Sequence, residues 1–157
     1  MAVRRLRVAL HHRYQRHPDS VNGVCTYCGD TADTIDHVPP LAMVYELADA
    51  GAYPGRLWLV PACHECNSTL SGRHLPTLAG RRKHLAHRYR RRYASLLRMP
   101  RWSNDELSEM KGVLREDIAR HWHLARFQRA RMERLLGRAY GEHTSEGKRA
   151  YASPGAP

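Results

Sequence analysis

Two Cys-x-x-Cys pairs, Cys25–Cys28 and Cys63–Cys66, constrain this chain more than any other feature of its sequence. Together they use all 4 cysteines. Four thiolates complete the tetrahedral coordination of Zn²⁺, and a two-residue spacing lets each pair chelate through a tight turn. Gly29 follows the first pair and can supply the left-handed backbone that such a turn favours. We therefore expect a structural zinc site, which leaves no open coordination position for catalysis.

The N-terminal stretch MAVRRLRVALHHRYQRH lacks the pattern of a signal peptide. Its longest apolar run is Val-Ala-Leu, much shorter than the apolar region that secretion requires. No other stretch approaches the roughly 18 apolar residues that span a bilayer. These features predict a cytoplasmic protein with no membrane partner. In a reducing compartment, cysteines are more often metal ligands than disulfides, which agrees with the expected zinc site.

The positive charge of the chain is concentrated in one segment. The formal net charge is +11, with 26 Lys and Arg residues against 15 Asp and Glu. From Asn67 to Asn104 there is no acidic residue. The basic residues of this window are Arg73, Arg81, Arg82, Lys83, Arg88, Arg90, Arg91, Arg92, Arg98 and Arg101. Such a balance predicts a polyanionic partner, most simply nucleic acid. The alternatives are a basic ribosome-associated protein or a solvated helix face, although a solvated face usually mixes both signs.

Turn-rich and helical patterns divide the chain and predict an α+β protein. We expect a basic N-terminal arm over residues 1–20, a small zinc-stapled core over residues 21–75, a basic α-helical extension over residues 76–140 and a disordered tail over residues 141–157. Within the core, TIDHV (residues 34–38) and RLWLV (residues 56–60) predict short strands. Between them, PLAMVYELADAG predicts a helix that begins after Pro40 and ends just before Gly51.

The extension repeats apolar residues at helical spacing. One predicted helical face carries Leu78, Leu85, Tyr89, Leu96 and Leu97. The sequence SNDE is a capping box, in which Glu106 follows Ser103 by three residues. It predicts the start of a second, long helix that continues through Gly112 to Leu136.

Asp36 and His37 lie next to each other on the first predicted strand, so their side chains should point to opposite faces. A neutral His can take a proton from water near pH 7. Carboxylate and amide oxygens suit Mg²⁺, and Asn67 offers an amide directly after Cys66, where a zinc site would brace it. These groups could serve phosphodiester hydrolysis, with His37 as the general base and with Asp36 and Asn67 as ligands of a catalytic divalent metal. The alternative is an ordinary surface Asp-His pair.

The order C-x-x-C, DHVPP, LWLVPA and CHECN resembles the HNH, or ββα-metal, nucleases over residues 25–73. More narrowly, it resembles their zinc-bearing subset, to which phage recombination endonuclease VII is similar. The resemblance implies a β-hairpin and a helix around one catalytic Mg²⁺ or Mn²⁺ ion, with the roles given above for Asp36, His37 and Asn67. It also implies a DNA substrate, duplex or branched, phage or mobile-element partner proteins, and action in a host cytoplasm. Arg73 falls where related proteins often place a basic residue near phosphate.

One position departs from the family pattern. Trp58 stands where the family usually has its middle Asn, which helps to hold the base-bearing loop in register. The alternative function is therefore a catalytically inactive, zinc-stabilised DNA- or RNA-binding module. In either case we predict phosphate contacts from Arg73, Arg81, Arg82, Lys83, Arg88, Arg91 and Arg92. These basic residues are too dense along the chain for one helical face to carry them all.

Overall fold

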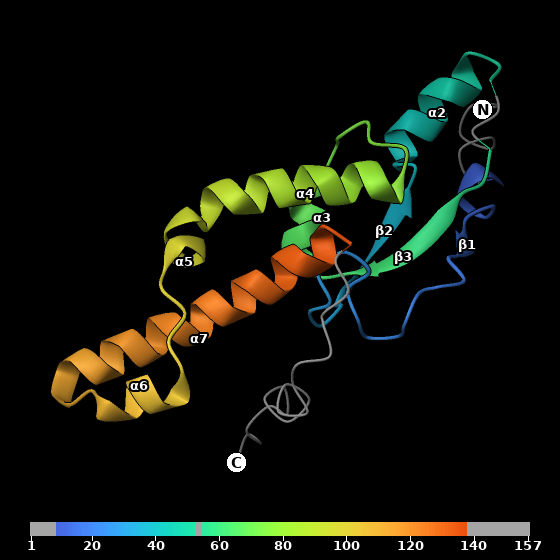
Figure 1. The fold of residues 1–157 in the computed structure, drawn as a ribbon. Coiled ribbons are helices and arrows are strands. Elements are labelled where there is room, and N and C mark those ends of the chain that lie inside the picture. Colours follow the sequence, from blue (N-terminus) through green and yellow to red (C-terminus); the bar gives the residue numbers. More distant parts are fainter. Residues whose placement is uncertain (1–8, 53–54, 138–157) are drawn as a thin grey trace.

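The computed structural model of the chain describes residues 9–52 and 55–137 and has an α+β architecture, which confirms the predicted class (Figure 1). A small sheet and α2 lie at one end of the molecule, and the other helices extend away from them (Figure 1). In chain order the elements are β1 (Gln15–Arg16), β2 (Thr34–Val38), α2 (Leu41–Asp49), β3 (Trp58–Ala62), α3 (His64–Leu70), α4 (Leu78–Arg92), α5 (Ala94–Arg98), α6 (Asn104–Glu109) and α7 (Gly112–Leu135).

The sheet has the strand order β1-β3-β2, with β1 parallel and β2 antiparallel to β3. Asp36 lies opposite Val60, and His37 lies opposite Leu59. The first predicted strand is confirmed. The second begins at Trp58 rather than Arg56 and runs through Pro61, which has no N–H to donate. The carbonyl oxygen of Pro61 accepts a hydrogen bond from the Thr26 backbone at 2.9 Å, which ties the loop between Cys25 and Cys28 to β3.

The predicted helix between the two strands is also confirmed. Pro40 is the N-cap of α2, where its fixed φ and missing N–H are tolerated, and Gly51 follows the helix with φ +71°. The helix packs with residues from the expected N-terminal arm. Leu10, Tyr14, Val44 and Leu57 form one buried apolar cluster. The part of the arm from residue 9 onward therefore belongs to the folded structure, while residues 1–8 lie outside the described residues.

The main hydrophobic core joins the cysteine region to the helical extension. Leu85, Ala86 and Tyr89 of α4 and Met132 and Leu135 of α7 pack in the same buried cluster as all four cysteines, Val38, Val60 and Leu70. In Figure 1, α4 and α7 lie side by side, and α4 also contacts α3. The expected zinc-stapled core and the helical extension thus share their buried residues.

The capping box at Ser103 is present, but the long helix predicted from it is wrong. The Ser103 hydroxyl accepts from the Glu106 backbone N–H, and the Glu106 carboxylate accepts from the Ser103 backbone N–H. The helix then ends at Glu109, and α7 begins at Gly112. Gly112 has φ +66°, a left-handed value that a continuous right-handed helix cannot contain. The tail predicted over residues 141–157 lies outside the described residues.

Among residues 9–52 and 55–137, every helix is too short or too polar to cross a lipid bilayer.

Candidate metal centre and nucleic-acid surface

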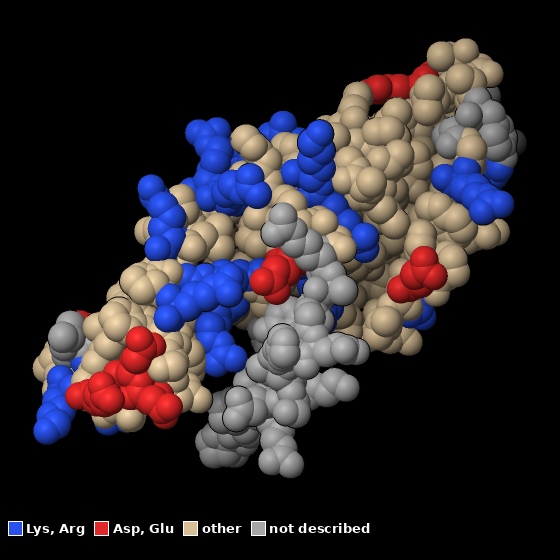
Figure 2. All heavy atoms as spheres, viewed as in Figure 1, with Lys and Arg blue, Asp and Glu red and all other residues tan. Residues whose placement is uncertain are grey.

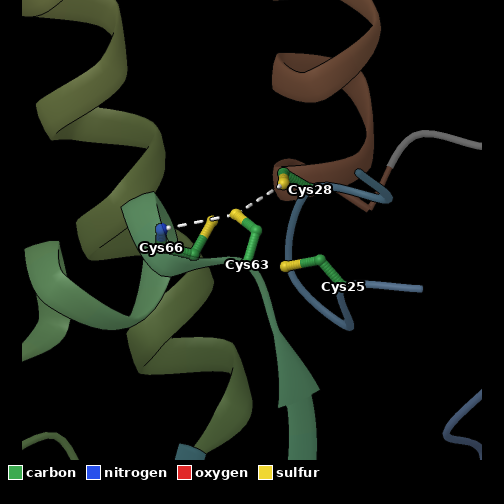
Figure 3. A group of neighbouring side chains, drawn as sticks. All are labelled: Cys25, Cys28, Cys63 and Cys66. Carbon is green, nitrogen blue, oxygen red and sulfur yellow. Dashed lines mark hydrogen bonds between the residues drawn. The ribbon is translucent and has the colours of Figure 1, made fainter. Parts of the chain in front are cut away.

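The four cysteines meet at the junction of β3, α3 and the loop before β2 (Figure 3). Cys25 and Cys28 come from that loop, Cys63 follows β3, and Cys66 lies in the first turn of α3. A hydrogen bond of 2.9 Å from the Gly29 backbone N–H to the Cys25 carbonyl closes the first turn. Gly29 has φ +78°, as the sequence predicts for the residue after the pair. The second pair is closed by the Cys66 N–H, which points at the Cys63 sulfur at 3.5 Å (Figure 3).

This cluster fits a metal ion such as structural zinc. The four sulfur atoms lie within 4.8 Å of one another, and the Cys28 and Cys63 sulfurs are 3.6 Å apart. A tetrahedral Zn²⁺ with Zn–S bonds of about 2.3 Å separates its sulfurs by about 3.8 Å. Hydrogen bonding to Cys28 and the other thiols lowers the pKa of Cys25, whereas hydrogen bonding to Cys25 raises the pKa of Cys66. Sulfurs held this close cannot all become thiolates without a cation between them.

Two helices from the extension brace the cysteine cluster. The Tyr89 hydroxyl of α4 is 3.3 Å from the Cys66 sulfur, and the Arg131 guanidinium of α7 donates to that hydroxyl at 2.9 Å. Arg131 also pairs with Glu65 at 2.7 Å and lies 3.9 Å from the Cys63 sulfur. Burial alone would lower the pKa of Arg131, but Cys28, Glu65 and Tyr89 raise it far above its usual range. Arg131 therefore stays cationic, which offsets the negative charge of a tetrathiolate metal centre.

Sequence reasoning did not identify Glu65, Tyr89 and Arg131 as part of this centre. Glu65 lies between the two cysteines of the second pair, which is the one signal that could have drawn attention to it. Arg131 is one of many arginines in the chain, and only its burial distinguishes it, at 3% exposed. These residues matter because outer contacts of this kind orient metal ligands.

Asp36 points into the protein, where two side chains already bind its carboxylate. It is 7% exposed, and its Oδ2 accepts from the Tyr27 hydroxyl at 2.5 Å and pairs with the Arg81 guanidinium. Arg81 is itself 1% exposed and donates from Nε to the Leu75 carbonyl at 2.9 Å. Burial, followed by the charge of Asp36, raises the pKa of Tyr27, so the phenol stays a hydrogen-bond donor.

Asn67 approaches the same strand from α3. Its Nδ2 donates to the Thr34 hydroxyl at 3.1 Å and to the Ile35 carbonyl at 3.3 Å. Asn67 thus contacts the two residues that precede Asp36. The donor types suit Mg²⁺ or Mn²⁺, but a divalent cation does not fit this arrangement, because the Asp36 carboxylate is paired with Arg81 and closed to solvent. A cation could reach Asp36 only if the Arg81 guanidinium moved away.

His37 lies on the other face of β2, as the alternation of strand side chains predicts. It is half-buried, and its Nε2 is 3.3 Å from Nε2 of His11. The ring also packs edge-on against Tyr14, with 4.8 Å between ring centroids, while the Tyr14 hydroxyl donates to the Pro39 carbonyl. Burial and the neighbouring His11 lower the pKa of His37, which favours the neutral imidazole. His11 and Tyr14 were not among the predicted site residues.

An exposed basic surface covers α4 and the loop before it (Figure 2). Arg73 is exposed in that loop. Burial, with the nearby charges of Arg73 and Arg88, lowers the pKa of His84, so the loop and the helix contribute to one positive region. We call this the α4 basic surface. Its exposed members are Arg73, Lys83, Arg88, Arg90, Arg91 and Arg92.

Three of the residues predicted to contact phosphate already have protein partners. Arg81 is buried against Asp36, so the prediction that it contacts phosphate is wrong for this arrangement. Arg82 is half-buried and donates to the Thr26 carbonyl at 3.0 Å. Arg92 is exposed but pairs with Glu65 at 3.2 Å. Arg81 thus points away from the α4 basic surface, and the predicted phosphate contacts of the other residues stay predictions.

Comparison of the chain with protein-family models, with curated proteins and with solved structures finds no match.

Proposed function

We propose that this protein is a zinc-stapled DNA endonuclease of the HNH, or ββα-metal, type. The observation that carries the proposal is the contact between α3 and β2. The cysteine cluster holds the start of α3 beside the sheet, and Asn67 reaches the Ile35 carbonyl, one residue before Asp36 and two before His37. The three residues on which the family resemblance depends therefore lie along one short stretch of β2 and the helix that contacts it.

His37 is the proposed general base. Its imidazole takes a proton from a water molecule at Nε2, the hydroxide attacks phosphorus, and one P–O bond of the backbone breaks as the departing oxygen gains a proton. In this structure Nε2 of His11 lies 3.3 Å from Nε2 of His37, so the water binds in place of the His11 ring or beside it. The Mg²⁺ or Mn²⁺ ion that the family resemblance implies does not fit while Arg81 pairs with Asp36. Its ligands would be Asp36 and Asn67 after Arg81 leaves the carboxylate.

DNA, duplex or branched, is the proposed substrate, with the α4 basic surface as its main contact. Arginine and lysine side chains on this surface would bind backbone phosphates without reading base sequence. Phage or mobile-element proteins remain the proposed partners, and a host cytoplasm the proposed compartment.

A second function is favoured by one specific observation, the Asp36–Arg81 ion pair. If Arg81 never leaves, the chain is a zinc-stabilised DNA- or RNA-binding module without hydrolytic activity. Trp58 at the position of the family's middle Asn points the same way. In this second proposal the Asp36 carboxylate forms a structural ion pair with Arg81 and does not bind a metal ion.

A plasmid-nicking assay with Mg²⁺ or Mn²⁺ separates the two functions. The first proposal expects His37→Ala to lower cleavage at least about a hundredfold, the usual contribution of a general base, while DNA binding persists. His121→Ala is the matched control, because His121 is exposed on α7 and bonds within its own helix. Equal turnover by the His37 variant and the wild-type protein contradicts the assignment. Binding without cleavage by the wild-type protein supports the second function.

A further inference from the structure

A cavity of about 300 Å³ lies between the segment that follows α5 and the face of α7. It is lined by Arg101, Trp102, Trp122, Arg126, Arg129, Ala130 and Glu133. Figure 1 shows this segment running beside α7 before it turns into α6, at a distance from the sheet and from α2. The cavity is therefore separate from the cysteine cluster and from the Asp36–His37 region.

The aromatic part of the cavity is held in place by direct contacts. Trp122 is 7% exposed, and its indole N–H donates to the Trp102 carbonyl at 3.0 Å. The guanidinium of Arg126 lies over the Trp122 ring, 4.7 Å from its centroid. Trp102 itself is half-buried and keeps part of its surface accessible. These contacts fix the segment to the helix, so the cavity exists before any ligand arrives.

The charged part of the cavity has an excess of positive charge. Three arginines face one carboxylate, that of Glu133. Within the described part of the chain, no carboxylate forms an ion pair with Arg101, Arg126 or Arg129. Arg101 and Arg129 both line the cavity, and the Arg129 guanidinium donates to the Met99 carbonyl. Burial, followed by repulsion from the charge of Arg101, lowers the pKa of Arg129. An anionic group between them would relieve that repulsion.

The position of the cavity relates it to the α4 basic surface. Arg98 and Arg101 continue the basic window beyond α4, and the acid-free window ends at Asn104. Directly beyond it, α6 carries Asp105, Glu106 and Glu109, all exposed. Figure 2 shows this acidic group gathered at the α6 end, next to the basic region. A polyanion that followed α4 would meet the cavity at the last favourable position before the acidic helix.

We propose that this cavity binds one nucleotide of a single-stranded nucleic acid, with its base against Trp102 and its phosphate between Arg101 and Arg129. The inference rests on the nucleic-acid binding proposed above and adds a strand preference to it. The cavity volume of about 300 Å³ is at the small end of the range for ligand sites, which suits one unpaired base better than a base pair. Aromatic side chains beside guanidinium groups are the usual means of holding unpaired bases without sequence preference.

The test compares three labelled probes by fluorescence anisotropy at low salt without added divalent metal. The probes are a blunt duplex, the same duplex with a single-stranded oligothymidine tail, and the free oligothymidine. We expect the tail to tighten binding to the wild-type protein. Trp102→Ala should weaken binding of the tailed duplex about five- to a hundredfold, the range for loss of one stacked base, and leave the blunt duplex unchanged. Trp102→Phe, which retains an aromatic ring, should keep most of the gain.

A second variant keeps the test valid if Trp102→Ala does not fold. Arg101 is exposed, so Arg101→Gln should preserve the fold and remove one phosphate contact. The log–log salt slope for the free oligothymidine should then fall by about 0.7. A tail that adds no affinity to the wild-type protein overturns the inference. So does competition by polyglutamate as effective as that by oligothymidine, because the cavity would then select charge alone.

The outcomes also distinguish this inference from the proposed function. Tail-dependent binding that Trp102→Ala removes, with no cleavage by the wild-type protein, supports the cavity and counts against the nuclease. Cleavage with no effect of the tail supports the nuclease and counts against the cavity.

Discussion

The chain contains two sets of side chains that its sequence predicts as metal ligands, and the structure treats them in opposite ways. The sulfurs of Cys25, Cys28, Cys63 and Cys66 converge within 4.8 Å. In the second set, Asp36 pairs with Arg81, and Asn67 donates its side-chain amide to the Thr34 hydroxyl and the Ile35 carbonyl. The difference shows how far each prediction depends on neighbours that are distant in the sequence.

The cysteine set is local in origin. Each pair is closed by its own tight turn, and the antiparallel strands bring the two turns together. Arg131 lies beside the cluster, 3.9 Å from the Cys63 sulfur, and leaves the space between the four sulfurs to a metal ion. The role of Asp36, in contrast, depends on α4, which brings Arg81 from 45 residues away. A buried carboxylate needs a partner, and a guanidinium can provide it as well as a metal ion can.

Removing one cysteine should have the largest effect, on zinc content and on folding, and it tests the cysteine cluster. Structural Zn²⁺ contributes roughly 10 kcal/mol or more to the folding free energy of small domains. The Cys63→Ser variant should therefore lose both its zinc and its folded structure. A strong chelator should have the same effect on the wild-type protein. Metal analysis should give about one zinc per wild-type chain. Ser68→Ala is the control, because Ser68 is exposed on α3. A folded, zinc-free protein would rule out the site.

Removing Arg81 tests whether a divalent cation can take its place. Arg81→Gln leaves Asp36 buried with Tyr27 as its remaining partner, and breaking a buried pair in this way costs about 3–5 kcal/mol. Zinc content should not change. If Asp36 can bind a metal, Mn²⁺ should recover part of the lost thermal stability, because a ligand that binds only the folded state stabilises it.

The double variant Arg81→Gln with Asp36→Asn is the control for this experiment. It lacks the carboxylate, so Mn²⁺ should not stabilise it. An equal response of the two variants to Mn²⁺ would mean that Asp36 is not a metal ligand, which favours the binding module over the nuclease.

Reversing two charges on the α4 basic surface should have the smallest effect, on DNA affinity alone. Arg88→Glu with Arg91→Glu should weaken binding to all duplex sequences alike. If each residue contacts one phosphate, the log–log salt slope should fall by about 0.9 per residue. Zinc content should stay the same, because neither residue contacts the cysteine cluster.

The matched control reverses Arg115 and Arg120, which are exposed on α7 outside the basic window. Wild-type affinity and salt dependence in the Arg88–Arg91 variant would mean that the α4 basic surface is a solvated face. The main DNA contact would then lie elsewhere on the chain.

The parts of the fold that the sequence predicts correctly are those with short-range causes. The first strand, α2 between Pro40 and Gly51, the left-handed Gly29 and the capping box at Ser103 all depend on residues within a few positions of one another. The error at Gly112 is different. Apolar spacing continues on both sides of this glycine, so periodicity alone does not reveal that the helix axis changes there.

For this protein, the sequence by itself determined the four-cysteine cluster, the α+β class and the charged segment, because spacing and composition are local properties. Only the tertiary structure decided which charged side chains remain available to bind a ligand. It buried Arg81 against Asp36, placed Arg131 beside the cysteines and brought His11 to His37. The physical reason is that the environment of a charged side chain depends on the side chains that contact it, which come from distant parts of the sequence. Helix packing, rather than the neighbouring sequence, brings these side chains together.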